Sequence, residues 1–153
     1  MKASQLLESA REHIIVTYPG RFQPFHRGHL EVFNKLQRRF GSENVFIVTS
    51  NKTDSVKSPF SFGDKLKFMQ ALGVPVHQVI ESDRPYELPA RFAHSTDRIV
   101  FITVVGEPDA GRLRPGSVKK DGQPSYFQNV PNSSNEFQTA DKHGYVIVEP
   151  EHS

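Results

Sequence analysis

Two apolar runs flank a helix-like segment near the start of the chain. Residues 14–18 and 45–49 are almost continuously apolar and rich in β-branched side chains, which is typical of parallel strands covered on both faces. Between them, residues 28–40 repeat apolar side chains at helical spacing, and Gly41 follows as a common helix stop. Strand, helix and strand in this order predict a βαβ unit with two parallel strands.

Further along the chain the same alternation continues with less regularity. The apolar spacing predicts a second helix over residues 61–72, a short strand over 76–82 and a last strand over 145–148. Residues 98–105 form the most strongly β-branched run, and we expect this strand at the centre of the sheet. A short helix is expected over residues 4–13.

Residues 106–139 break the pattern, because four prolines stand among glycine, serine and asparagine residues. We expect a long irregular loop here, mobile for want of a packing partner, and long loops of this kind are usually functional or disordered. The remaining elements predict an α/β fold, a Rossmann-like mostly parallel sheet with flanking helices. With 153 residues, we expect a single domain.

Composition narrows the class of protein only slightly. The formal net charge of +2 is too small to indicate nucleic-acid binding, although 19 basic residues suit a phosphate-rich small substrate. The chain has no cysteine, so it forms neither disulfides nor thiolate metal sites. The apolar runs are too short to cross a bilayer, and the first residues lack the apolar core of a signal peptide. We therefore expect a cytoplasmic protein without membrane contact, and a homo-oligomer is compatible with the sequence.

The segment GRFQPFHRGH, residues 20–29, contains the strongest group of candidate functional residues. It joins the first predicted strand to the following helix, whose first backbone N–H groups lack partners within the helix and favour an anion. Gly20 and Gly28 allow a ligand to approach the backbone closely, and His26 and His29 offer imidazole donors. This combination predicts a phosphate-binding turn.

The spacing His26-x-Gly28-His29 resembles the HxGH motif of the nucleotidyltransferase superfamily, the cytidylyltransferase-like proteins. The longer string GRFQPFHRGHLEV is most similar to the nicotinamide-nucleotide adenylyltransferases. The resemblance implies adenylyl transfer from ATP to a mononucleotide such as nicotinamide mononucleotide, with release of pyrophosphate. The implied partners are a nucleoside triphosphate and a small phosphorylated substrate.

The resemblance also implies Mg²⁺ as the cofactor, carried on the triphosphate without metal ligands from the protein. Two other functions remain open. One is a cytidylyltransferase that acts on a phosphorylated alcohol or sugar, and the other is a nucleotide-binding module without catalytic activity. A preference for CTP would indicate the first, and binding of ATP without release of pyrophosphate would indicate the second.

By the same resemblance, the catalytic residues are His26, on the β- or γ-phosphate side, and His29, at the α-phosphate. The resemblance also places nucleotide-binding residues in the turn after the first predicted strand and in the turn after residues 98–105. They are Gly20, Arg21, Phe22, Gly28, Gly106 and Asp109. Lys52, in the polar segment after the second predicted strand, is a further candidate nucleotide-binding residue.

Residues 58–65, SPFSFGDK, resemble the NPFxxGER segment of the archaeal nicotinamide-nucleotide adenylyltransferases. This resemblance implies Phe60 and Lys65 as substrate-binding residues. Lys65 stands where the family has arginine, so it keeps the charge but loses the planar fork of a guanidinium. A structural interpretation also fits, in which Ser61 is the N-cap of a helix.

The superfamily also has a late serine- and threonine-rich motif that ends in arginine and opens a helix. Residues 94–98, HSTDR, are superficially similar, but the arginine is one residue too close and a strand is predicted to follow. We interpret this similarity as fortuitous. The resemblance covers residues 13–110 well, and we expect a motif of this kind beyond residue 153.

Overall fold

A single sheet of six parallel strands organises the molecule. The computed structural model describes residues 13–133 and 136–149, so the helix predicted over residues 4–13 lies almost entirely outside the described residues. The strand order is β3-β2-β1-β4-β6-β5, and every neighbouring pair is parallel. The α/β Rossmann-like fold class predicted from the sequence is confirmed. The strands are β1 (Ile14–Pro19), β2 (Val45–Thr49), β3 (Val79–Glu81), β4 (Val100–Val105), β5 (Phe127–Asn129) and β6 (Gly144–Val148).

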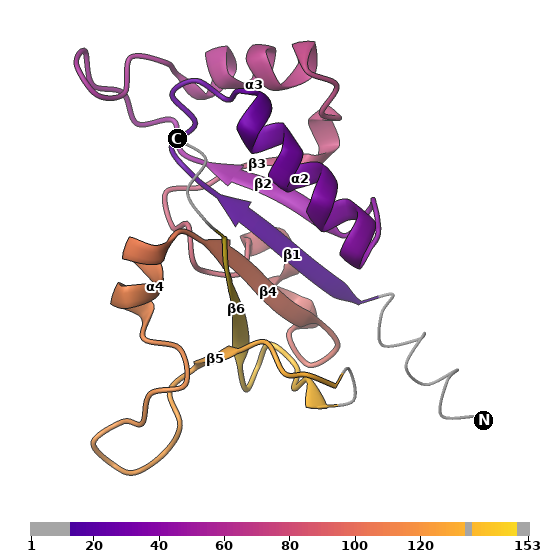
Figure 1. Ribbon diagram of the computed structural model, residues 1–153, viewed down its shortest axis with the longest axis vertical. Helices are drawn as coiled ribbons and strands as arrows, with labels where there is room; N and C mark the ends of the chain where they lie inside the picture. The colour runs from indigo at the N-terminus through magenta and orange to yellow at the C-terminus, as the bar shows by residue number, and fades with distance from the viewer. Residues whose placement is uncertain (1–12, 134–135, 150–153) are drawn as a thin grey trace.

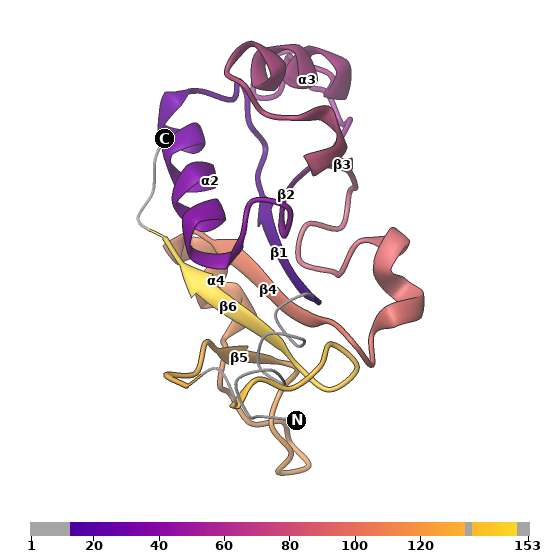
Figure 2. The same ribbon diagram turned by 90° about the vertical axis from the view of Figure 1, so that its right-hand side faces the viewer.

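Helices cover the sheet from both sides (Figures 1 and 2). The longest, α2, lies along one face, and the segment with the short 3-10 helix η2 lies on the opposite side. The helical elements are α2 (Arg27–Phe40), α3 (Phe62–Ala71), α4 (Glu107–Leu113), η1 (Val76–Gln78) and η2 (Ala90–Ser95).

The core lies on both faces of β1 and its neighbours, as continuous apolar strands require. On one face, Val16 and Ile102 pack with Phe33 of α2, and all three are at most 2% exposed. On the other face, Phe46 of β2 packs against Phe92 of η2, with ring centroids 5.3 Å apart. Full burial of one such side chain stabilises the fold by about 1.5–3 kcal/mol. The strands that carry the site are therefore fixed from both sides.

The structure corrects the prediction of one long loop over residues 106–139. Helix α4 begins directly after β4, with Gly106 as its N-cap and Pro108 in its first turn. Proline suits the first turn of a helix, because its missing N–H would have no partner there. Strand β5 then adds a short edge strand to the sheet beside β6. The prediction of a strand over residues 76–82 is also wrong in its first half, which forms η1.

The strand order reverses between β1 and β4, and this reversal locates a crevice. The chain passes from β1 to β2 and β3 on one side, whereas β4 and the later strands lie on the other. Connections therefore leave the carboxyl ends of β1 and β4 in opposite directions. In open parallel sheets this switch point is where ligands bind.

Two glycines with opposite environments test the packing of the outer strands. A Cβ at Gly144 would lie 2.9 Å from the ring of Tyr126 and 3.0 Å from that of Phe127, whereas one at Gly111 in α4 would meet nothing within 4 Å. We expect Gly144→Ala to lower the free energy of unfolding by about 1–3 kcal/mol through overpacking. Gly111→Ala should raise it by about 0.5–1 kcal/mol, because glycine disfavours a helix. Urea denaturation of both variants measures this difference, and equal effects would contradict it.

Candidate functional site

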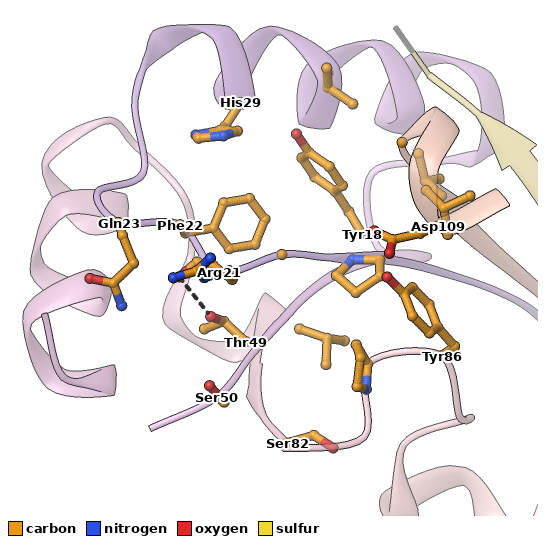
Figure 3. A pocket seen from close by; sticks show the side chains of 18 of the residues that line it. Tyr18, Arg21, Phe22, Gln23, His29, Thr49, Ser50, Ser82, Tyr86 and Asp109 are labelled. Atoms are coloured by element: carbon orange, nitrogen blue, oxygen red, sulfur yellow. Dashed lines mark hydrogen bonds between the residues drawn. The ribbon is translucent and has the colours of Figure 1, made fainter. Parts of the chain in front are cut away.

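A cavity of about 700 Å³ opens at the switch point between β1 and β4. Its wall combines the turn after β1, the ends of β2 and β4, the segment after β3, and α4 (Figure 3). Most of the site residues predicted from the sequence share this cavity. They are Gly20, Arg21, Phe22, His26, His29, Lys52, Gly106 and Asp109. Gly28, Phe60 and Lys65 are not among the residues that line it.

The turn after β1 is shaped by the close contact of Phe22 with Gly20. Phe22 adopts a left-handed backbone conformation, with φ of 47°, and its ring is 4% exposed. A Cβ at Gly20 would lie 2.8 Å from the Phe22 ring, so only glycine fits under it. The N–H of Gly20 donates to the carbonyl of Val48 at 3.1 Å, which continues the pairing of β1 with β2 into the turn.

The two motif histidines cap helix α2 reciprocally. His26 is the N-cap residue, and its Nδ1 accepts from the N–H of Gly28 at 3.1 Å. The Nδ1 of His29 accepts from the N–H of His26, also at 3.1 Å. Because each Nδ1 accepts a backbone hydrogen bond, each neutral imidazole carries its proton on Nε2. The cap therefore selects the same tautomer for both rings.

Aromatic packing holds the imidazole rings in place. The rings of His26 and His29 stack with centroids 3.7 Å apart. Phe22 meets the His29 ring edge-on at 4.9 Å, and Phe25, which is 2% exposed, stacks on it at 5.4 Å. Phe22 and Phe25 thus orient His29 against the cavity. Gly28 contributes through its backbone to the cap.

The segment before α3 is tied to the same turn by two side chains. The Nη2 of Arg21 donates to Ser58 Oγ at 2.9 Å and to the carbonyl of Lys57 at 3.2 Å. Gln23 forms two hydrogen bonds with the backbone of Phe60, donating to its carbonyl at 2.9 Å and accepting from its N–H at 2.8 Å. Phe60 therefore serves the site through its backbone. Gln23, within the quoted motif, has a positioning role that sequence reasoning missed.

Lys65 is buried beneath the cavity. Its helix has the predicted N-cap, because Ser61 Oγ accepts from the N–H of Asp64 and Asp64 accepts in return. The Lys65 side chain is 1% exposed, and its Nζ donates to Thr49 Oγ1 at 2.9 Å and to the carbonyl of Ser50 at 2.7 Å. Burial lowers the pKa of Lys65, and the nearby charge of Arg21 lowers it further.

On the α4 side of the cavity, the polar groups are carboxylates, phenols and the guanidinium of Arg112. Asp109 pairs with Arg112 at 3.2 Å and accepts a hydrogen bond from the hydroxyl of Tyr86. Burial raises the pKa of Tyr86, and the hydrogen bond to Asp109 raises it further. Figure 3 shows Asp109 and Tyr86 facing each other across this part of the wall. Tyr86 follows β3 in an irregular segment that gave no sequence signal.

Tyr18 and Glu149 complete this wall at the ends of β1 and β6. Glu149 forms an ion pair with Lys35 of α2 at 3.1 Å. Burial raises the pKa of Tyr18, and the negative charge of Glu149 raises it further. Both residues line the cavity, and neither was predicted from the sequence. The phenols therefore stay protonated at neutral pH and act as hydrogen-bond donors or acceptors.

The two sides of the cavity differ in the polar groups that they offer to a ligand. The turn after β1 contributes imidazoles, a guanidinium and backbone donors, whereas the α4 side contributes acceptors and paired charges. This division suits a ligand with phosphates at one end and hydroxyl or amide groups at the other. Arg98, in the fortuitous motif, is exposed and is not among the lining residues.

Within residues 13–133 and 136–149, no three histidine, aspartate or glutamate side chains converge in a group suited to a metal ion. The helices in this part of the chain are also too short or too polar to cross a membrane.

Comparisons with known proteins agree with the geometry. Residues 17–112 match the family model described as cytidylyltransferase-like. Nicotinamide-nucleotide adenylyltransferase of Saccharolobus solfataricus is 36% identical over 53 residues, which are 35% of this chain and 31% of that protein. Nicotinamide-nucleotide adenylyltransferase 1 of Sulfolobus acidocaldarius is 41% identical over 49 residues, which are 32% of this chain and 28% of that protein. The match to this chain thus spans about a third of the length of these relatives.

The reciprocal cap makes a spectroscopic prediction. In the free protein at neutral pH, we expect His26 and His29 to show the Nε2–H tautomer in ¹⁵N-edited NMR spectra, because both Nδ1 atoms accept backbone hydrogen bonds. His94, which is exposed and lies outside the cavity, serves as the control. An Nδ1–H tautomer at either motif histidine would show that the cap does not form in solution.

Proposed function

The chain belongs to the cytidylyltransferase-like family, and we propose that it is a nucleotidyltransferase that transfers the adenylyl group of ATP to a mononucleotide such as nicotinamide mononucleotide. The observation that carries this proposal is the pair of capping histidines, both of which line the cavity at the switch point. The likeness to two nicotinamide-nucleotide adenylyltransferases supports the choice of adenylyl group and acceptor.

In the proposed reaction, a phosphate oxygen of the mononucleotide attacks the α-phosphorus of ATP. A new P–O bond forms there, the bond from the α-phosphorus to the bridging oxygen breaks, and pyrophosphate leaves with that electron pair. Little covalent chemistry is required of the protein. Alignment of the two substrates and neutralisation of the charge on the phosphoryl oxygens lower the barrier.

The triphosphate would lie against the turn after β1 and the first turn of α2. His29 would donate to the α-phosphate, where charge develops during transfer, and His26 would donate on the β- or γ-phosphate side. The positive end of the α2 dipole and the charges of Arg21 and Lys52 favour the same position. Arg21 would exchange its bonds to residues 57 and 58 for a phosphate.

Mg²⁺ would arrive with ATP and be held by phosphate oxygens and water. Magnesium commonly binds in this way, with few protein ligands. The turn after β1 suits that arrangement, because its side chains are imidazoles and a guanidinium, which bind phosphate oxygens and leave the metal to the substrate. Asp109, Tyr86 and Gly106, on the opposite side, would contact the nucleoside part of one substrate.

The first test is release of pyrophosphate with each of the four nucleoside triphosphates, with and without nicotinamide mononucleotide and Mg²⁺. We expect release with ATP only when the mononucleotide is present. Faster release with CTP and a phosphorylated alcohol or sugar would indicate a cytidylyltransferase. Binding of ATP with no release under any condition would indicate a nucleotide-binding module and contradict the proposed activity.

A variant of the motif tests the assignment of His29. We expect His29→Ala to reduce kcat by about 10²–10³-fold while the Kd for ATP changes less, because the donor would act mainly on charge that develops during transfer. His94→Ala removes an exposed histidine outside the cavity and should leave both constants unchanged. Urea denaturation of His29→Ala separates a loss of the helix cap from a loss of chemistry. Full turnover in a folded His29→Ala would exclude His29 from the mechanism.

A further inference from the structure

Lys65 is a buried cation without an anionic partner. Its side chain is 1% exposed, and its Nζ donates only to neutral oxygens, those of Thr49 and Ser50. None of the ion pairs among residues 13–133 and 136–149 includes it. The charged group that acts on it is Arg21, which is also positive. A charge removed from water without a counter-ion costs several kcal/mol, so its retention needs an explanation.

The place of Lys65 in its helix increases this cost. It is the fourth residue of α3, so its charge lies in the first turn, where the helix dipole is also positive. The cap of this helix is complete without Lys65, because Ser61 and Asp64 satisfy each other. The role of Lys65 is therefore not that of a helix cap.

The two oxygens that hold the ammonium belong to the wall of the cavity. Thr49 and Ser50 both line it, at the carboxyl end of β2. The hydroxyl of Thr49 also donates to the carbonyl of Arg21 at 3.4 Å, which links Lys65 to the turn that carries the motif (Figure 3). The ammonium is thus directly behind the wall, on the side where Arg21 and Lys52 supply positive charge.

We propose that Lys65 is an electrostatic component of the polyphosphate site, a buried cation that acts through the wall formed by Thr49 and Ser50 and is compensated only when a polyanion occupies the cavity. This inference rests on the proposed function. It differs from the substrate contact predicted from the sequence, since Lys65 attracts the phosphates without touching them. At the effective dielectric constant of about 20 that describes buried sites, the attraction between this ammonium and a polyanion on the other side of the wall changes the affinity by about tenfold.

An electrostatic role and a scaffolding role predict opposite effects on stability and binding. Lys65→Gln keeps an N–H donor for the wall but removes the charge. If the charge of Lys65 attracts the bound phosphates, Lys65→Gln should be at least as stable as the parent protein and should bind a polyanion less tightly. If Lys65 only supports β2, the variant should lose stability and keep its affinity.

The experiment uses inorganic tripolyphosphate, which probes the phosphate side without nucleoside contacts. Isothermal titration calorimetry gives its Kd for the parent protein and for Lys65→Gln, and urea denaturation gives the unfolding midpoint of each. We expect a Kd about tenfold higher in Lys65→Gln, with an unchanged or higher midpoint. Lys67→Gln is the matched control, because Lys67 is exposed on the same helix and its loss changes the net charge equally.

A measurement on the unaltered protein keeps the test independent of how the variant folds. In spectra of protein labelled with ¹³C at lysine Cε, Lys65 should show a pKa below the ordinary lysine value of 10.5. Saturating tripolyphosphate should raise that pKa, because the bound anion stabilises the ammonium. The same linkage predicts that the free energy of unfolding rises with pH between the folded-state pKa and 10.5, since the unfolded chain binds the proton more tightly.

Three results would overturn the inference while leaving the proposed function intact. These are equal affinity in Lys65→Gln and the parent protein, an equal loss of affinity in Lys67→Gln, and a Lys65 pKa that tripolyphosphate does not raise. If Lys65→Gln loses both stability and affinity, the rise in pKa of the unaltered protein decides for the electrostatic role, and its absence decides against it. No binding of tripolyphosphate by the parent protein would overturn both the inference and the proposed phosphate site.

Discussion

The cap of helix α2 is the interaction on which the site depends. The first turn of any helix leaves backbone N–H groups without partners, and here two imidazoles accept two of these hydrogen bonds. The same bonds fix the ring tautomers and, with the packing of Phe22 and Phe25, the orientation of His29. The structural need of the helix and the chemical need of a phosphate site are therefore met by the same atoms. A serine or aspartate cap would satisfy the helix but would supply no imidazole N–H donor.

The elements around this cap could be predicted from the sequence because their determinants are local. Strand, turn and helix follow one another within residues 14–40, and periodicity, glycine positions and the motif all indicate the same structure. Helix α4 was missed because Pro108 was interpreted as a break, although it occupies the first turn, where proline is favourable. The N-cap role of Ser61 was available from the sequence for the same local reason.

The rest of the cavity could not be predicted, because its residues come together only through the sheet. Tyr86 and Glu149 reach the wall from the ends of β3 and β6, and nothing in their flanking residues indicates a site. Lys65 matched a family position, yet its burial follows from the packing of α3 against the end of β2. The polarity of the two sides, cationic at the turn and acceptor-rich at α4, is likewise a property of strand order rather than of any segment.

The pairing of β1 with β4 has a kinetic consequence. Val16 lies opposite Ile102 in the register, so the two sides of the cavity are joined by residues that are far apart in the chain. The histidine cap closes over four residues, whereas this pairing must first overcome the entropy of closing a long loop. We therefore expect the cavity to assemble only after β4 has paired with β1. Substitutions in β1 or β4 that change the rate of this pairing, although they lie away from the ligand site, would change how soon a newly made chain has a complete site.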